Sequence, residues 1–171
     1  MKTRFDRFTH LLSVVGATFA GALLLLMVGH IVLEMTLRAF FDRSTYVLDE
    51  FVGYEVAALT MLGLGYALNT GGILRVNLLT QKLPAGVLRW LELANVLMVL
   101  ALMGVLIWFQ YAAVATAFGR GTLSGTLSNT PTWIPMAVFL AGITLFALQL
   151  VAYAIRLIRT GELIETTKDE I

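Results

Sequence analysis

The stretch Leu11–Leu33 reads LLSVVGATFAGALLLLMVGHIVL and contains no Asp, Glu, Lys or Arg. Its polar interruptions are limited to Ser13, Thr18 and His30. About 20 residues of α-helix cross the hydrocarbon core of a bilayer, at 1.5 Å per residue. This stretch is therefore long enough to span a membrane with some tilt, and it predicts a transmembrane helix.

A secretory signal peptide is the competing interpretation of the same stretch. Lys2, Arg4 and Arg7 precede it, and Ala20-Gly21-Ala22 resembles a cleavage site. The apolar region of a signal peptide, however, is only about 7–15 residues long. Because the apolar run continues to Leu33, the pattern favours an uncleaved membrane span.

Composition supports a membrane protein. The chain has 171 residues, of which 58% are hydrophobic and 13% charged, whereas a soluble domain carries about 25% charged residues. It has no cysteine, which excludes disulfides, thiol catalysis and thiolate metal sites. With only two histidines and a net charge of +1, we expect no metal, no cofactor and no nucleic-acid partner.

Three more apolar stretches follow the first. The pattern predicts an all-α integral membrane protein, a single membrane domain over 1–171, with four transmembrane helices over 11–33, 51–69, 90–115 and 133–157. Small residues recur within these spans, including Gly16, Gly63, Gly65 and Gly142. Small residues let membrane helices approach closely, so we expect them to be packing contacts.

The connections differ in character. Residues 36–50 mix charges with aromatic side chains, which predicts an interfacial amphipathic segment in the headgroup layer between the first two spans. The connection 70–89 opens with turn residues and contains a short amphipathic stretch that Pro84 ends. The loop 119–132 has three glycines, a proline and several hydroxyls, so we expect it to be polar.

The distribution of lysine and arginine predicts the orientation. If both termini lie in the cytoplasm, nine of these residues flank the cytoplasmic helix ends and three flank the other side. Positive residues prefer the cytoplasmic side. The connection 70–89 is then cytoplasmic and the loop 119–132 periplasmic.

Charged residues within the spans all lie near span ends. His30, Glu34 and Arg38 are four residues apart and share a helix face, which predicts a Glu34–Arg38 ion pair; a proton relay or substrate contact is the alternative. Glu55 and Glu92 are expected to reach the interface, or to pair with Arg43 and Arg89 respectively. A carrier normally needs a charge or a broken helix near the membrane midplane, and none is present.

Two other kinds of protein fit a small helical bundle. A self-sufficient homo-oligomeric transporter or channel would line its path with Asn95, Gln110 and the His30–Glu34 pair. A membrane anchor of a redox complex would need two facing haem ligands. His10 and His30 lie on one helix, about 30 Å apart by helical rise, so they cannot bind the same haem.

Four motifs carry a resemblance to a known family. They are Leu37–Ser44 (LRAFFDRS) followed by Asp49-Glu50; Gly72–Leu79 (GILRVNLL) followed by Leu83-Pro84; Thr130-Pro131 with Trp133 and Pro135; and Gly142 with Leu148-Gln149. In order and spacing the chain resembles, over roughly Leu11–Leu157, the DctQ-like small permease subunit of tripartite ATP-independent periplasmic (TRAP) transporters. It departs from the family pattern at Asn77, usually acidic, and at Leu74, near a frequent histidine.

The resemblance implies a division of labour in the bacterial inner membrane. A large multi-span permease subunit would carry organic acid and sodium, and a periplasmic substrate-binding protein would deliver the solute. This chain would be a scaffold with no catalytic residue. The implied partner or interfacial contacts are Glu34, Arg38, Arg43, Asp49, Glu50, Arg75, Pro84 and Arg120. Arg38, Arg43, Asp49 and Glu50 are expected to form one cluster at the periplasmic interface.

Overall fold

The computed structural model describes residues 4–70 and 84–160, and its regular structure there is helical, apart from an isolated bridge between Leu123 and Pro131. The helices are α1 (Arg4–Phe41), α2 (Leu48–Asn69), α4 (Ala85–Arg120) and α5 (Trp133–Thr160). All four are long and apolar enough to cross a membrane. The prediction of an all-α protein with four membrane-spanning helices is confirmed at this level.

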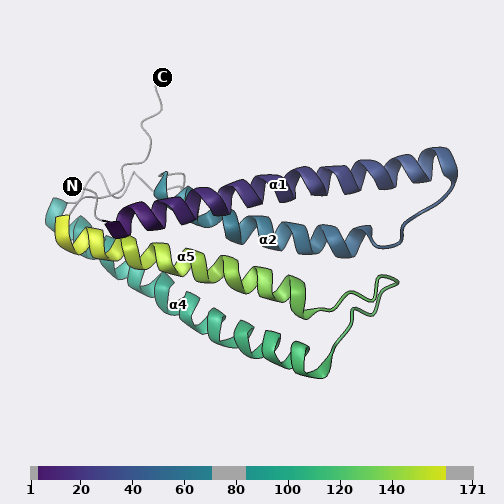
Figure 1. Cartoon of the computed structure of the whole chain (residues 1–171). Helices are drawn as coiled ribbons and strands as arrows, with labels where there is room; N and C mark the ends of the chain where they lie inside the picture. The colour runs from purple at the N-terminus through teal and green to yellow at the C-terminus, as the bar shows by residue number, and fades with distance from the viewer. Residues whose placement is uncertain (1–3, 71–83, 161–171) are drawn as a thin grey trace, which may run out of the picture.

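The helices run antiparallel to their neighbours in the chain (Figure 1). Helix α2 packs between α1 and α5, and α4 packs on the other side of α5. We call the end where α1 begins and α5 finishes the terminal end. The opposite end, with the connections 42–47 and 121–132, is the loop end (Figure 1).

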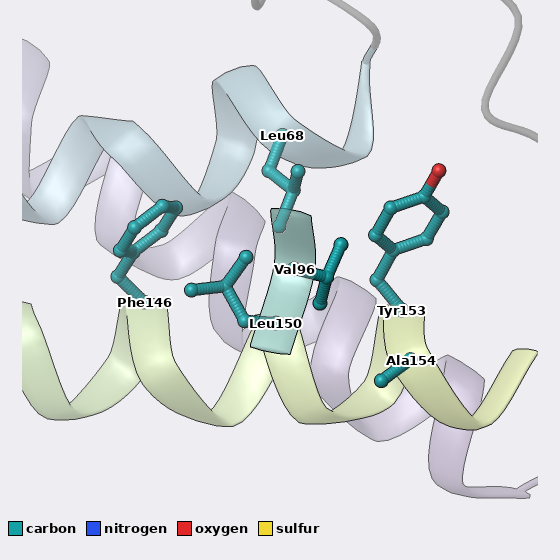
Figure 2. Packing of buried hydrophobic residues seen from close by; sticks show 6 residues of the cluster. All are labelled: Leu68, Val96, Phe146, Leu150, Tyr153 and Ala154. Atoms are coloured by element: carbon teal, nitrogen blue, oxygen red, sulfur yellow. The ribbon is translucent and has the colours of Figure 1, made fainter. Parts of the chain in front are cut away.

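The core is centred on α5 near the terminal end. Its buried side chains recur at Ile143, Phe146, Leu150, Tyr153 and Leu157, a helical spacing that lines one face. Leu68 of α2 and Val96 of α4 complete the cluster (Figure 2). Helices α1 and α4 instead expose many large apolar side chains. This is expected for surfaces that face lipid or a partner protein.

Glycines permit the closest helix contacts. A Cβ added at Gly142 of α5 would lie 2.7 Å from the Met61 Cβ of α2. One added at Gly16 of α1 would lie 3.0 Å from the carbonyl oxygen of Leu62. The prediction that small residues serve as packing contacts holds at these two positions and at Gly65 of α2, where an added Cβ would overlap the Gln149 side chain of α5.

The connection between α1 and α2 is shorter than predicted. Residues 36–41 continue α1, and 48–50 form the first turn of α2, so the structure shows no separate element over 36–50. No glycine or proline lies between His30 and Phe41, so nothing in the sequence ends the helix at residue 36. The chain reverses only at residues 42–47, where Asp42 and Tyr46 have positive φ values of 54° and 57°.

The predicted connection 70–89 is also shorter on its C-terminal side. Pro84 is the N-cap of α4, and residues 85–89 are already helical. Proline suits the start of a helix because its φ is fixed near −65° and it lacks an N–H. Arg75 and most of the predicted amphipathic stretch lie outside the described residues.

Candidate functional site

A buried carboxylate at the loop end organises the connection between α1 and α2. Glu34 is 2% exposed and accepts a hydrogen bond from Arg38 Nε at 2.7 Å and from Thr45 N at 3.0 Å. The hydroxyls of Ser44 and Thr45 also donate to it. The predicted Glu34–Arg38 pair is confirmed, and the two hydroxyl residues complete the set of donors.

A second carboxylate joins α2 to the loop 119–132. Glu50 accepts hydrogen bonds from Tyr54 Oη at 2.9 Å, from Ser128 Oγ at 2.7 Å and from the Thr126 hydroxyl. The loop has internal structure as well, because Ser124 is buried and its backbone N–H donates to the Thr130 carbonyl at 2.8 Å. Two segments 76 residues apart in the chain are thus held together.

The other predicted contact residues are more dispersed. Arg43 and Asp49 are exposed, and Arg120 is exposed in the last turn of α4. The expected single cluster is therefore two groups, one around Glu34 with Arg38 and one around Glu50. The structure does not bring Arg120 or Pro84 into either hydrogen-bonded group.

A histidine–glutamate pair links α1 to α2 further along the helices. His30 Nδ1 lies 2.8 Å from Glu55 Oε1, and Glu55 is buried. The ring of Phe51 meets the His30 ring edge-on at 5.8 Å between centroids. The predicted pairing of Glu55 with Arg43 is wrong, because antiparallel packing sets residue 55 opposite residue 30, whereas Arg43 lies past the end of α1.

The predicted pairing of Glu92 with Arg89 is also replaced by other contacts. Its carboxylate accepts a hydrogen bond from Tyr153 Oη at 2.8 Å, while Arg89 Nη2 donates to the Ile158 carbonyl at 2.7 Å. Both bonds run from α4 to α5. The polar ends of these spans therefore hold the two helices together near the terminal end.

Sequence reasoning missed a buried polar group that joins three helices. Asn69 of α2 donates to the Ser13 hydroxyl of α1 and, at 3.3 Å, to Gln149 Oε1 of α5. Ser13 and Gln149 are 1% and 3% exposed. Gln149 could have indicated this group, because it lies inside a long apolar run and a buried amide needs hydrogen-bond partners.

The residues proposed to line a channel do not converge. Gln110 donates to the Met136 carbonyl at 3.2 Å, and Asn95 is exposed on α4. His30 lies against Glu55 on the α1–α2 side. Gln110 and His30 each contact a neighbouring helix, and the three side chains lie in separate places.

The polar groups at the loop end hold parts of this chain together. The donors around Glu34 and Glu50 occupy the lone pairs that a general base or a metal ligand would use. Among residues 4–70 and 84–160, no group of three or more His, Asp or Glu residues could hold a metal ion. We therefore interpret these polar groups as structural contacts that hold the helices and their connections together.

These features define a class: a small multi-pass helical membrane protein whose charges lie at the helix ends. A family model for the DctQ component of tripartite ATP-independent periplasmic transporters matches residues 27–160. The chain belongs to this family. No curated protein and no solved structure was found to match it.

Family membership assigns a general role. The DctQ family is a transporter component and not an enzyme family, and its members work with DctM and a substrate-binding protein. The resemblance drawn from the sequence motifs is confirmed at the level of the family.

Proposed function

We propose that this chain is the small scaffold subunit of a sodium-coupled transporter for organic acids, and that it braces the large permease subunit in the bacterial inner membrane. The family match over residues 27–160 carries the proposal. The large subunit and the substrate-binding protein are the partners. Solute and sodium pass through the large subunit.

The position of the charges supports this division of labour. The apolar stretches 11–33, 56–69, 93–119 and 133–155 contain no Asp, Glu, Lys or Arg. Transport of a charged solute normally uses an ionisable group or a broken helix near the midplane. The exposed apolar faces of α1 and α4 offer surface for a membrane partner.

The proposed orientation rests on the positive-inside rule. We place the terminal end in the cytoplasm and the loop end in the periplasm, since the sequence then assigns nine of its twelve lysines and arginines to cytoplasmic segments. Glu34, Glu50 and the loop 119–132 then lie on the periplasmic side.

Co-expression with a large DctM-type subunit tests the scaffold role. We expect the two chains to co-purify in detergent at constant stoichiometry. We also expect sodium-driven organic acid uptake in proteoliposomes that contain both chains and the binding protein. A stable chain that forms no complex with the large subunit, or that moves solute when reconstituted alone, would contradict the proposal.

Docking of the binding protein is a second role for the loop end. Arg43 and Asp49 are exposed there, whereas Glu50 holds the loop and is a poor choice for a charge reversal. Electrostatic complementarity acts mainly on the rate of association. We expect the paired reversals Arg43→Glu and Asp49→Lys to slow binding-protein association several-fold while the complex stays intact.

Arg7→Gln, near the start of α1 at the terminal end, is the matched control because it removes a charge on the opposite side of the membrane. Uptake would be measured at several binding-protein concentrations. If the paired reversals leave both association and uptake unchanged, the docking role is excluded and the scaffold role stands.

A further inference from the structure

A cavity lies where the start of α4 meets the end of α5, away from the carboxylate groups of the loop end. It has a volume of about 210 Å³ and is lined by Arg89, Trp90, Leu93, Leu157 and Ile158. The lining thus combines one guanidinium and one indole with three aliphatic side chains. A polar headgroup joined to an acyl chain has this same amphipathic composition.

The described charges near the cavity are mainly positive. Arg89, Arg156 and Arg159 are close to it in sequence, against the single carboxylate of Glu92. That carboxylate already accepts the Tyr153 hydroxyl at 2.8 Å. The Arg156 guanidinium lies 5.8 Å from the Tyr153 ring centroid, so Arg156 and Glu92 belong to one internal group.

Among the side chains that the structure describes near the cavity, Arg89 and Arg159 are the exposed cations. Arg89 uses one nitrogen, Nη2, to donate to the Ile158 carbonyl at 2.7 Å. A guanidinium carries five N–H donors, so it can bind an anion as well. The first turn of α4 contains no acidic residue, so the partial positive charge of the helix N-terminus is not offset there.

The cavity lies near the ends of two helices that are long and apolar enough to span a membrane, and lipid headgroups surround the ends of such helices. Arg89 is in the second turn of α4, and Ile158 is in the last turn of α5. Trp90 is 73% exposed, and tryptophan is enriched where membrane meets water. Basic pockets between membrane helices bind anionic lipid headgroups.

We propose that this cavity binds an anionic phospholipid, with the phosphodiester on Arg89 of the lining and the start of an acyl chain along Leu93 and the exposed Ile158. Arg159, one residue beyond Ile158 in the chain, adds positive charge beside the site. The apolar lining selects a lipid over free phosphate. This site does not depend on the proposed scaffold role. A variant that loses lipid selectivity can still be tested separately for complex formation with the large subunit.

Tryptophan fluorescence provides a direct test, with Trp90 as the reporter. The other two tryptophans are changed by Trp108→Phe and Trp133→Phe, and the full chain is reconstituted in phosphatidylcholine vesicles. Increasing fractions of brominated phosphatidylglycerol or brominated phosphatidylcholine are then added. We expect phosphatidylglycerol to show an association constant at least about fivefold higher, since each arginine near the surface contributes about that factor.

Three variants test which arginines cause the preference for phosphatidylglycerol. Arg89→Gln and Arg159→Gln are each expected to lower it about fivefold. Arg159→Gln removes an exposed side chain, so it tests the site even if Arg89→Gln disturbs the α4–α5 contact. Arg120→Gln, at the other end of α4, should leave the preference unchanged.

Two outcomes would overturn the proposal. One is equal quenching of Trp90 by the two brominated lipids in the parent protein. The other is a phosphatidylglycerol preference that survives both Arg89→Gln and Arg159→Gln, because the lipid would then be bound elsewhere.

Discussion

At the scale of single residues, Glu34 shows how a charged group is accommodated at a membrane edge. A buried carboxylate is tolerated when donors replace the water it loses. Arg38 lies one helical turn away and the sequence predicts its contact, whereas Ser44 and Thr45 reach the carboxylate only because the chain reverses over residues 42–47. The carboxylate therefore fixes the path of the connection.

Glu34→Gln tests this role. The amide keeps the size of the side chain but replaces one acceptor oxygen by a donor, so at least one of the surrounding donors loses its partner. We expect the midpoint of thermal unfolding in detergent to fall by several degrees. Asp49→Asn, an exposed carboxylate at the same end, is the control. Equal midpoints for the two variants would contradict the role assigned to Glu34.

At the scale of helices, α5 is the element against which the others pack. Its buried residues fall on one face, and Gly142 brings that face against the Met61 backbone of α2, with an added Cβ only 3.2 Å from the carbonyl carbon. Because backbone atoms cannot rotate away as a flexible side chain does, this contact requires glycine. The polar group of Ser13, Asn69 and Gln149 joins α1, α2 and α5.

Gly142→Ala tests the close contact between α2 and α5. The added methyl overpacks the interface, and overpacking costs about 1–3 kcal/mol. Reversible unfolding in mixed micelles would measure the loss of free energy. Gly104→Ala is the control, since an added Cβ there meets no atom within 4 Å. On an exposed helix face this change is expected to be neutral or slightly stabilising. A loss as large for Gly104→Ala would contradict the interpretation.

At the scale of the whole molecule, the antiparallel connections set both described chain ends at the terminal end (Figure 1). The orientation of that end in the membrane is a proposal that rests on the positive-inside rule. The chain contains no cysteine, so a single introduced cysteine is a unique label.

Gly125→Cys lies in the loop at the loop end, and Gly86→Cys lies at the start of α4. Both glycines are exposed. In intact spheroplasts a membrane-impermeant maleimide should label Gly125→Cys fully and Gly86→Cys only after permeabilisation, at least a tenfold difference in labelling. The reverse labelling pattern would contradict the proposed topology.

The sequence by itself determined the number of helices, their approximate positions and the family, because apolar stretches long enough to span a bilayer are a one-dimensional property. It also determined the Glu34–Arg38 pair, since residues four apart meet on any helix. The tertiary structure alone decided that Glu55 meets His30, that Glu50 holds the loop 119–132, and that Asn69 joins Ser13 to Gln149. These contacts link residues on different helices. Their register depends on how glycines and side chains pack in three dimensions, which the pattern of apolar stretches does not encode. Several of the charged residues that the sequence predicts near the helix ends therefore make, in the structure, contacts that hold the helices and their connections together.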